Sequence, residues 1–234
     1  MNLTKAFSPS MAITDLSSLS KTQVGFLLTL LITMSGLSYY WQAGVIETMA
    51  GITGVTCVFL VNMKKLSNFL FGFINCLLYG YVAYQASYYG DTMLNWMFYL
   101  PIQLIGAHYW VKSMEGGEVV SRKITSVKVL STLVVVTMLT VFAYSTLLSL
   151  IGGSLSTVDA TTTTLSVLAT YFMVKGYREQ WVCWIIVNIL SIFMWVQSYL
   201  IDGEGISVLI MWVMFLVNSV YGCYTWFKST KGEK

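Results

Sequence analysis

Long apolar runs separated by short polar segments make up most of the chain. A helix needs about 20 mostly apolar residues to cross a lipid bilayer. Eight runs of this kind lie at about 23–41, 43–62, 67–88, 94–111, 127–151, 158–175, 181–200 and 206–227. Together they leave no room for a soluble domain among the 234 residues. The pattern therefore predicts an all-α polytopic membrane protein.

The composition agrees with this class. Hydrophobic residues make up 56% of the chain and charged residues only 10%, whereas soluble globular domains carry about 25% charged residues. All four cysteines fall inside the apolar runs, at Cys57, Cys76, Cys183 and Cys223. A disulfide framework would instead place pairs in exposed loops. We expect four small buried thiols, and no cysteine or histidine spacing predicts a metal or a cofactor.

The two ends of the chain are polar. No small-residue cleavage pattern follows the first apolar run, so residues 22–41 are predicted to be an extra N-terminal transmembrane helix rather than a signal peptide. Residues 1–21 are predicted to form a mobile or surface-lying arm. Residues 228–234 are predicted to form a cytoplasmic tail.

With eight spans, every basic residue falls on one side of the membrane. The thirteen are Lys5, Lys21, Lys64, Lys65, Lys112, Arg122, Lys123, Lys128, Lys175, Arg178, Lys228, Lys231 and Lys234. Loops enriched in Lys and Arg face the cytoplasm, so both termini are predicted to be cytoplasmic. The opposite loops hold Glu47, Asp91, Asp159, Asp202 and Glu204. These acids either reflect the same charge rule or form a vestibule that concentrates a cationic solute.

An internal repeat relates residues 43–112 to residues 158–227. With a shift of 113, Asn75, Gly90 and Asp91 meet Asn188, Gly203 and Glu204, and with a shift of 116, Trp96, Gly106 and Trp110 meet Trp212, Gly222 and Trp226. Residues 43–112 and 158–227 are therefore predicted to be two parallel three-helix bundles joined by a linker helix at 127–151, a 3+1+3 arrangement. Parallel repeats in transporters place the substrate site near the midplane between them.

The run at 181–200 carries an unusual polar face. Trp181, Trp184, Asn188, Ser191 and Trp195 recur at steps of three and four and share one side of a helix. An amide as deep as Asn188 needs a partner, which is a helix, a water or a ligand. Trp181 lies near enough to the helix start to serve partly as an interface anchor. Flat indoles beside an amide suit a flat, hydroxylated solute, and a cationic ring would add about 2 kcal/mol of cation–π attraction.

Neighbouring runs show similar faces. Further candidate binding residues are Asn75, Tyr79, Gln103, Trp212 and either Asn218 or Ser219. Amides also join helices to one another in membranes, and for Asn75 and Asn218 that alternative stays open. The chain has no His-Glu-x-x-His motif, no Gly-x-Ser-x-Gly motif and no nucleotide-binding loop. We therefore expect passive, facilitated transport, and neither an enzyme nor an energy-coupled pump.

Several of these segments resemble the PnuC family of vitamin-precursor transporters. The matching segments, within residues 40–230, are Glu47 with Thr53-Gly54, Tyr88-Tyr89-Gly90-Asp91, and Glu179-Gln180-Trp181-Val182-Cys183-Trp184 with Asn188. The resemblance implies uptake of nicotinamide riboside through the bacterial inner membrane by facilitated diffusion, as an alternating-access uniporter. It also implies a SWEET-like build, a homotrimer, no nucleic-acid partner, and trapping of the solute by a cytoplasmic nicotinamide riboside kinase.

The resemblance also implies a binding role for particular residues. It carries that role onto Trp181, Trp184, Asn188 and Gln197, while Asn75 and Tyr79 are placed by the repeat. The first repeat has Asn68 and Phe71 where the second has the Trp-x-x-Trp motif, so the site is expected to be asymmetric. Thiamine, riboflavin or a sugar remain alternative substrates, and a membrane-embedded enzyme or a receptor is the alternative from another class.

Overall fold

The computed structural model describes residues 3–85, 92–150, 155–202 and 206–230. The expected loop residues Tyr88, Tyr89, Gly90, Asp91, Gly203 and Glu204, and the tail residues Lys231 and Lys234, lie outside these ranges. The α-helices are α1 (Pro9–Ser17), α2 (Lys21–Tyr40), α3 (Val45–Asn62), α4 (Asn68–Gln85), α6 (Leu100–Ser113), α7 (Val127–Leu150), α8 (Ser156–Lys175), α9 (Gln180–Asp202) and α10 (Ile206–Ser229). A 3-10 helix, η1 (Leu3–Phe7), a π-helix, η2 (Leu94–Tyr99), and a hairpin of β1 (Met114–Glu115) and β2 (Glu118–Val119) complete the chain.

Each of the eight predicted apolar runs coincides with a helix. By length and composition, α2, α3, α7 and most of α9 and α10 are long and apolar enough to cross a membrane. Helix α4 contributes a shorter apolar stretch, Asn68–Val82. The π-helix η2 runs directly into Pro101 of α6. Because proline cannot donate a backbone hydrogen bond, the helical hydrogen-bond pattern is interrupted here, and the wider π-turn before Pro101 accommodates that interruption.

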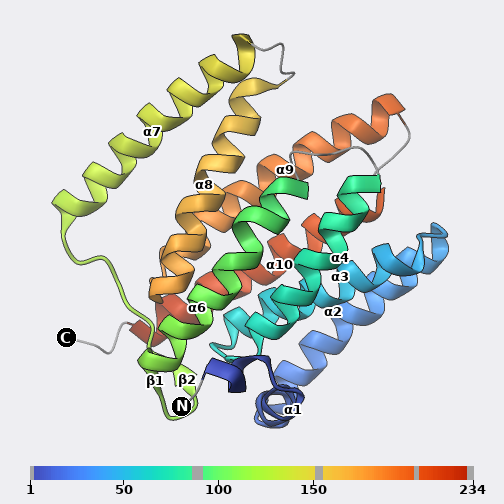
Figure 1. The fold of residues 1–234 in the computed structure, drawn as a ribbon, viewed down its shortest axis with the longest axis vertical. Helices are drawn as coiled ribbons and strands as arrows, with labels where there is room; N and C mark the ends of the chain where they lie inside the picture. The colour runs from blue at the N-terminus through green and yellow to red at the C-terminus, as the bar shows by residue number, and fades with distance from the viewer. Residues whose placement is uncertain (1–2, 86–91, 151–154, 203–205, 231–234) are drawn as a thin grey trace.

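Six helices form a ring of contacts in the described part of the chain. Each helix touches the next in the order α3, α4, α6, α8, α9, α10, and α10 returns to α3. Helix α2 packs outside this ring against α3 and α10, and α7 lies outside it against α8 (Figure 1). The α3/α10 contact and the α6/α8 contact, here called the two seams, join the first three helices to the last three.

The turn between α3 and α4 has the same geometry as the turn between α8 and α9. The two turns are 112 residues apart, one fewer than the predicted shift of 113. Lys64 and Gly176 both adopt left-handed backbone, with φ of 57° and 75°. The next residues close the same helix end: the Lys65 N–H donates to the Leu60 carbonyl at 2.9 Å, and the Tyr177 N–H to the Phe172 carbonyl at 2.8 Å. These pairs lie 112 residues apart, as do the starts of α4 and α9.

This register changes which residues are equivalent. The predicted shift of 113 is one residue too large over these helices, so Cys76, and not Asn75, takes the place of Asn188. The shift of 116 holds for the third helices, because α6 and α10 end at Ser113 and Ser229. Lys64 hides the correct register in the sequence, since a left-handed helix end normally carries glycine, as at Gly176.

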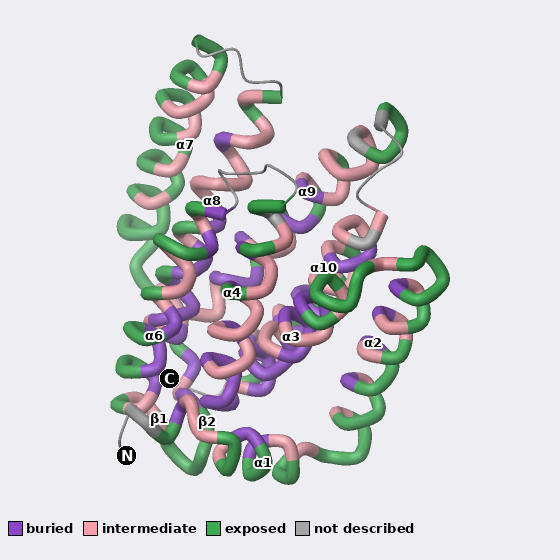
Figure 2. The backbone as a smooth tube through the Cα atoms, turned by 45° about the vertical axis from the view of Figure 1, so that its right-hand side comes forward, coloured by how far each residue is buried: buried purple, intermediate pink, exposed green. Residues whose placement is uncertain are grey.

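Burial is concentrated at the end of the molecule that carries the β-hairpin, here called the hairpin end (Figure 2). A buried cluster there joins both halves of the ring; its members are Ala6, Val61, Leu66, Phe69, Ala107, Trp110, Val119, Met173, Val174, Trp181 and Trp226. In contrast, none of the 24 residues of α7 is buried. An apolar helix this exposed requires lipid or another protein surface around it.

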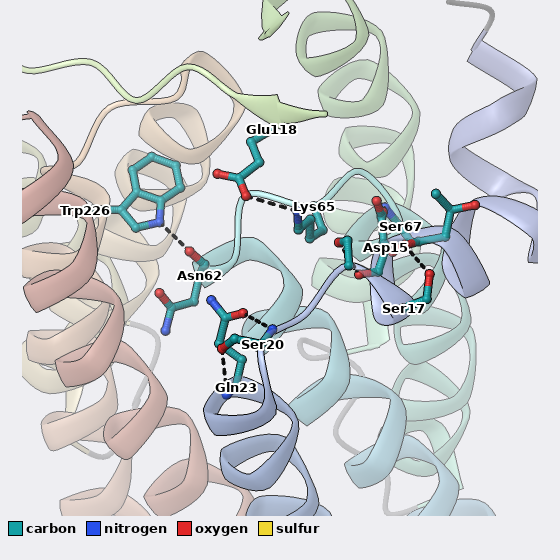
Figure 3. A network of polar contacts seen from close by, with 11 residues as sticks. Asp15, Ser17, Ser20, Gln23, Asn62, Lys65, Ser67, Glu118 and Trp226 are labelled. Atoms are coloured by element: carbon teal, nitrogen blue, oxygen red, sulfur yellow. Dashed lines mark hydrogen bonds and ion pairs between the residues drawn. The ribbon is translucent and has the colours of Figure 1, made fainter. Parts of the chain in front are cut away.

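The N-terminal arm is attached to the hairpin end. The Asp15 carboxylate, only 5% exposed, accepts the Ser67 backbone N–H at 2.8 Å, directly before α4 (Figure 3). Phe7 packs edge-on against Phe73 with ring centroids 5.9 Å apart. In the structure the arm therefore packs against α4. Ser20 and Gln23 then form a capping box that starts α2.

Candidate functional site

The polar face of α9 points into the protein. Asn188 is 2% exposed, and Ser191 is also buried. The Asn188 amide donates to the Ser219 hydroxyl of α10 at 2.9 Å. Of the two candidates on α10, Asn218 and Ser219, it is therefore Ser219 that contacts Asn188.

The two tryptophans of the motif have different surroundings. Trp181 is 2% exposed and lies on Gly222 of α10, where a Cβ would be 2.7 to 2.8 Å from three atoms of its ring system. Trp184 is half-buried and packs against two clusters, one containing Trp181 and the other Phe172. Only Trp184 therefore offers exposed ring surface on which a flat solute can stack.

The α3/α10 seam contains a chain of buried amides. Asn218, fully buried, donates to the Val58 carbonyl at 2.9 Å and accepts from the Asn62 amide at 3.5 Å. The Asn62 side-chain oxygen accepts the Thr225 hydroxyl at 2.7 Å, and its backbone carbonyl accepts the Trp226 indole N–H at 2.9 Å (Figure 3). Asn218 thus joins helices, which was the open alternative to a binding role.

Asn75 lies nearer the middle of the same seam. Its amide donates to the Ala50 carbonyl at 2.8 Å. Gly54 makes room for it, because a Cβ there would lie 2.8 Å from the Asn75 nitrogen and 3.3 Å from the Phe215 ring. Tyr79 and Trp212 pack against one small cluster of Met34, Ile210 and Met211. The Trp212 indole nitrogen is buried and has no hydrogen-bond partner among the described residues.

Gln103 faces α4. It is 8% exposed, and its amide nitrogen approaches the Cys76 sulfur at 3.9 Å. Gly72 lies beside the Gln103 side-chain oxygen, where a Cβ would be 2.5 Å away; that oxygen has no partner within the part of the chain that is described. The Gln103–Cys76 pair occupies the place in the first half that Ser219–Asn188 occupies in the second.

The predicted residues therefore fall into three groups, and one lies apart. Trp181, Trp184 and Asn188 form the α9/α10 group; Asn75, Tyr79, Trp212 and Asn218 lie along the α3/α10 seam; and Gln103 lies between α4 and α6. Gln197 is half-buried toward the other end of α9. A groove of about 680 Å³ between α7 and α8 contains none of these residues.

Sequence reasoning missed one buried polar residue beside the motif. Gln180 is fully buried, and both polar atoms of its amide lack partners among the residues that the structure describes. Gln180 precedes Trp181 in the motif, but a glutamine at a helix start normally faces solvent, so its burial was not predictable. Asn62 and Thr225, the seam partners of Asn218, were also not predicted.

A multi-pass bundle of apolar helices with amides and indoles between them defines a polytopic membrane protein. A family model described as nicotinamide mononucleotide transporter matches residues 44–228. The chain belongs to this family, and the protein is a transporter rather than an enzyme. The predicted resemblance to the PnuC family is confirmed.

Particular relatives and a solved structure agree. The chain is 38% identical to the nicotinamide riboside transporter PnuC of Neisseria mucosa, over 80% of this chain and 73% of that protein. It is 39% identical to the transporter of the same name from Haemophilus influenzae, over 78% of this chain and 79% of that protein. It also matches the crystal structure of the vitamin B3 transporter PnuC with a TM-score of 0.84 at 33% identity, covering 97% of this chain and 100% of that one.

Proposed function

We propose that this protein carries nicotinamide riboside through the bacterial inner membrane by facilitated diffusion, as a uniporter with alternating access. Two relatives, each at least 38% identical, carry that substrate in their names. The observation that carries the proposal is the α9/α10 group, in which the half-buried Trp184 lies on the same helix face as the buried amide of Asn188.

The chemistry of the solute suits this group. The pyridinium ring of nicotinamide riboside is flat and cationic, so it stacks on the Trp184 face with cation–π attraction. Its carboxamide or ribose hydroxyls pair with the amide of Asn188, and Gln197 stays a proposed contributor toward the other end of α9. Asn75, Tyr79, Gln103, Trp212 and Asn218 stay proposed contributors from the other helices.

The substrate is the riboside rather than its 5′-phosphate, although the family description mentions the mononucleotide. The nine proposed binding residues include no lysine, arginine or histidine. Phosphate groups in proteins are usually held by such cations, often through bidentate arginine. An anionic phosphate buried among amides and indoles without a cation is strongly disfavoured.

The same proposal covers the assembly and its surroundings. The ring consists of two three-helix bundles in a 3+1+3 arrangement of SWEET-like build, with α7 as linker and α2 as the extra helix. Relative movement of the bundles at the two seams gives alternating access. The hairpin end and both termini face the cytoplasm, where a nicotinamide riboside kinase traps the solute. The unburied α7 face supports assembly into a homotrimer.

A comparison of binding affinities on the purified protein tests which compound is the substrate. Nicotinamide riboside, its 5′-phosphate, thiamine, riboflavin and glucose are titrated calorimetrically, in detergent, under identical conditions. We expect the riboside to bind most tightly and glucose and the mononucleotide to bind at least about a hundredfold more weakly, which corresponds to roughly 3 kcal/mol. If thiamine, riboflavin or glucose binds more tightly than the riboside, that compound and not nicotinamide riboside is the substrate. Tighter binding of the mononucleotide would refute the exclusion of a phosphate from a site without cations.

A further inference from the structure

Trp181 is held from two sides by residues of α10. Its ring system lies flat on Gly222, because a Cβ there would be nearly equidistant from three ring atoms. The Trp226 ring meets it at 6.0 Å and 69°, a T-shaped contact. Trp226 is itself fixed, since its indole N–H donates to the Asn62 carbonyl across the α3/α10 seam at 2.9 Å. Because Trp181 is only 2% exposed in this packing, its ring faces are not available for stacking.

The first half of the ring has the same arrangement around Phe69. Gly106 makes room for this ring, because a Cβ there would lie 2.5 Å from Phe69 Cε1. The Trp110 ring meets it at 5.1 Å and 84°. Trp110 likewise donates its indole N–H across the other seam, to the Met173 carbonyl at 2.9 Å. Phe69 and Trp181 are 112 residues apart, which is the register of the two helices.

The two arrangements differ in one functional group. Phe69 has no polar atom, whereas the indole nitrogen of Trp181 is buried and has no hydrogen-bond partner among the described residues. At the equivalent position a benzyl ring makes the same contacts with a glycine and a tryptophan, so these two contacts do not require an indole. A buried donor left without an acceptor is costly, and its presence in a transporter indicates that an acceptor arrives with the solute.

We propose that Gly222 and Trp226 are positioning residues that hold the Trp181 indole so that its N–H, rather than its face, binds the transported solute. The matching group on the solute is a neutral oxygen acceptor, such as a carboxamide or hydroxyl oxygen. This inference rests on the proposed function, which supplies such a solute. It assigns different tasks to the two motif tryptophans: Trp184 stacks and Trp181 donates a hydrogen bond.

Paired alanine variants test the positioning role. Gly222→Ala displaces Trp181, and Gly106→Ala introduces the same methyl group at the equivalent position against Phe69. Thermal stability in detergent and nicotinamide riboside affinity are measured for both. We expect similar losses of thermal stability, with affinity about tenfold weaker, or about 1.4 kcal/mol, only for Gly222→Ala. Equal affinities for the two variants would overturn the positioning role.

Paired phenylalanine variants test the donor directly. Trp181→Phe reproduces the first-half arrangement and removes only the N–H and the second ring, while Trp110→Phe removes an N–H that is already bonded to Met173. We expect about tenfold weaker binding for Trp181→Phe and wild-type affinity for Trp110→Phe. The double variant of Gly222→Ala and Trp181→Phe should lose no more affinity than Trp181→Phe alone, because both act through one group.

The outcomes separate this inference from the proposed function. If the wild-type protein does not bind nicotinamide riboside, the proposed function fails. If the wild-type protein binds it and Trp181→Phe binds it equally well, the proposed function stands and the donor role is overturned. Additive losses in the double variant would overturn the positioning role while leaving the donor role intact.

Discussion

At the scale of single residues, the environment of each tryptophan decides what it can do. The three- and four-residue spacing correctly predicted that Trp181, Trp184 and Asn188 share one side of α9. It did not reveal that Gly222, a residue of another helix, covers Trp181 and leaves Trp184 half-buried. Contacts between distant segments carry this information, and a periodic pattern within one segment does not.

A substitution at Trp184 tests the stacking role. Trp184→Ala should weaken nicotinamide riboside binding on the order of thirtyfold, because a desolvated cation–π contact contributes about 2 kcal/mol. The control is Trp41→Ala, since Trp41 is 40% exposed at the end of α2, outside the ring. Calorimetric affinities of the two variants are compared with the wild type. Unchanged affinity in Trp184→Ala would show that the solute does not stack on Trp184.

The amides show where residue-level prediction was limited. Sequence reasoning left open whether Asn75 and Asn218 bind solute or join helices, and the structure shows both in helix-to-helix hydrogen bonds. The residue type does not separate these roles, because the same amide satisfies a neighbouring carbonyl or a ligand equally well. The one-residue error in the repeat had a similar origin, since it followed the identity of Asn75 and Asn188 rather than backbone geometry.

At the scale of elements, helix positions were predictable and their attachments were not. All eight apolar runs are helices, with boundaries within a few residues of those expected. The β-hairpin and the docking of the arm depend on contacts such as Asp15 with Ser67, which are 52 residues apart. Hydropathy marks a polar arm as lying outside the membrane and says nothing about the helix end that it caps.

Asp15 provides a test of this attachment. Asp15→Ala should destabilise the protein by about 1 to 2 kcal/mol, because it leaves the buried Ser67 N–H at the start of α4 without an acceptor. Asp15→Asn, which retains an acceptor oxygen, should lose less. Amide hydrogen exchange over residues 67–71 and thermal unfolding in detergent provide the readouts. Equal behaviour of the two variants would show that the cap does not stabilise α4.

The segment 114–126, here called the strap, contacts both halves of the ring at the hairpin end. The Val119 N–H donates to the Lys64 carbonyl at 3.2 Å, and the Arg122 N–H to the Gly176 carbonyl at 2.7 Å. These acceptors are the two left-handed residues that end α3 and α8, so the strap repeats one contact in each half. An ion pair between Lys65 and Glu118, at 3.0 Å, adds a side-chain link to the first half (Figure 3).

Charge exchange tests whether this ion pair holds the strap. Glu118→Lys should speed proteolysis and amide exchange of residues 114–126, and combining it with Lys65→Glu should restore wild-type rates. The effect on stability should stay below about 1 kcal/mol, because half of the Glu118 side chain is exposed. Glu115→Lys makes the same charge change in the hairpin at an exposed site and serves as the control. If Glu118→Lys and Glu115→Lys speed proteolysis and amide exchange of the strap equally, the Lys65–Glu118 ion pair does not specifically hold it.

At the scale of the whole molecule, the fold class followed from composition, and the arrangement of helices did not. A chain with 10% charged residues and eight apolar runs has few alternatives to a multi-pass bundle. Which helices touch depends on side-chain packing between them, and the ring with α2 and α7 outside it emerges only from the structure. Lipid-facing and protein-facing apolar residues look alike in a sequence, so the exposure of α7 was not predictable.

The proposed function specifies the solute that crosses the membrane, nicotinamide riboside, and requires no ion gradient to drive it. The most direct measurement is uptake of radiolabelled nicotinamide riboside into proteoliposomes that contain the purified protein, with unlabelled riboside inside and no ion gradient. We expect rapid counterflow of label that is lost in Trp184→Ala and unaffected in Trp41→Ala. No counterflow by the wild-type protein, or uptake only when a proton or sodium gradient is imposed, would contradict a nicotinamide riboside uniporter.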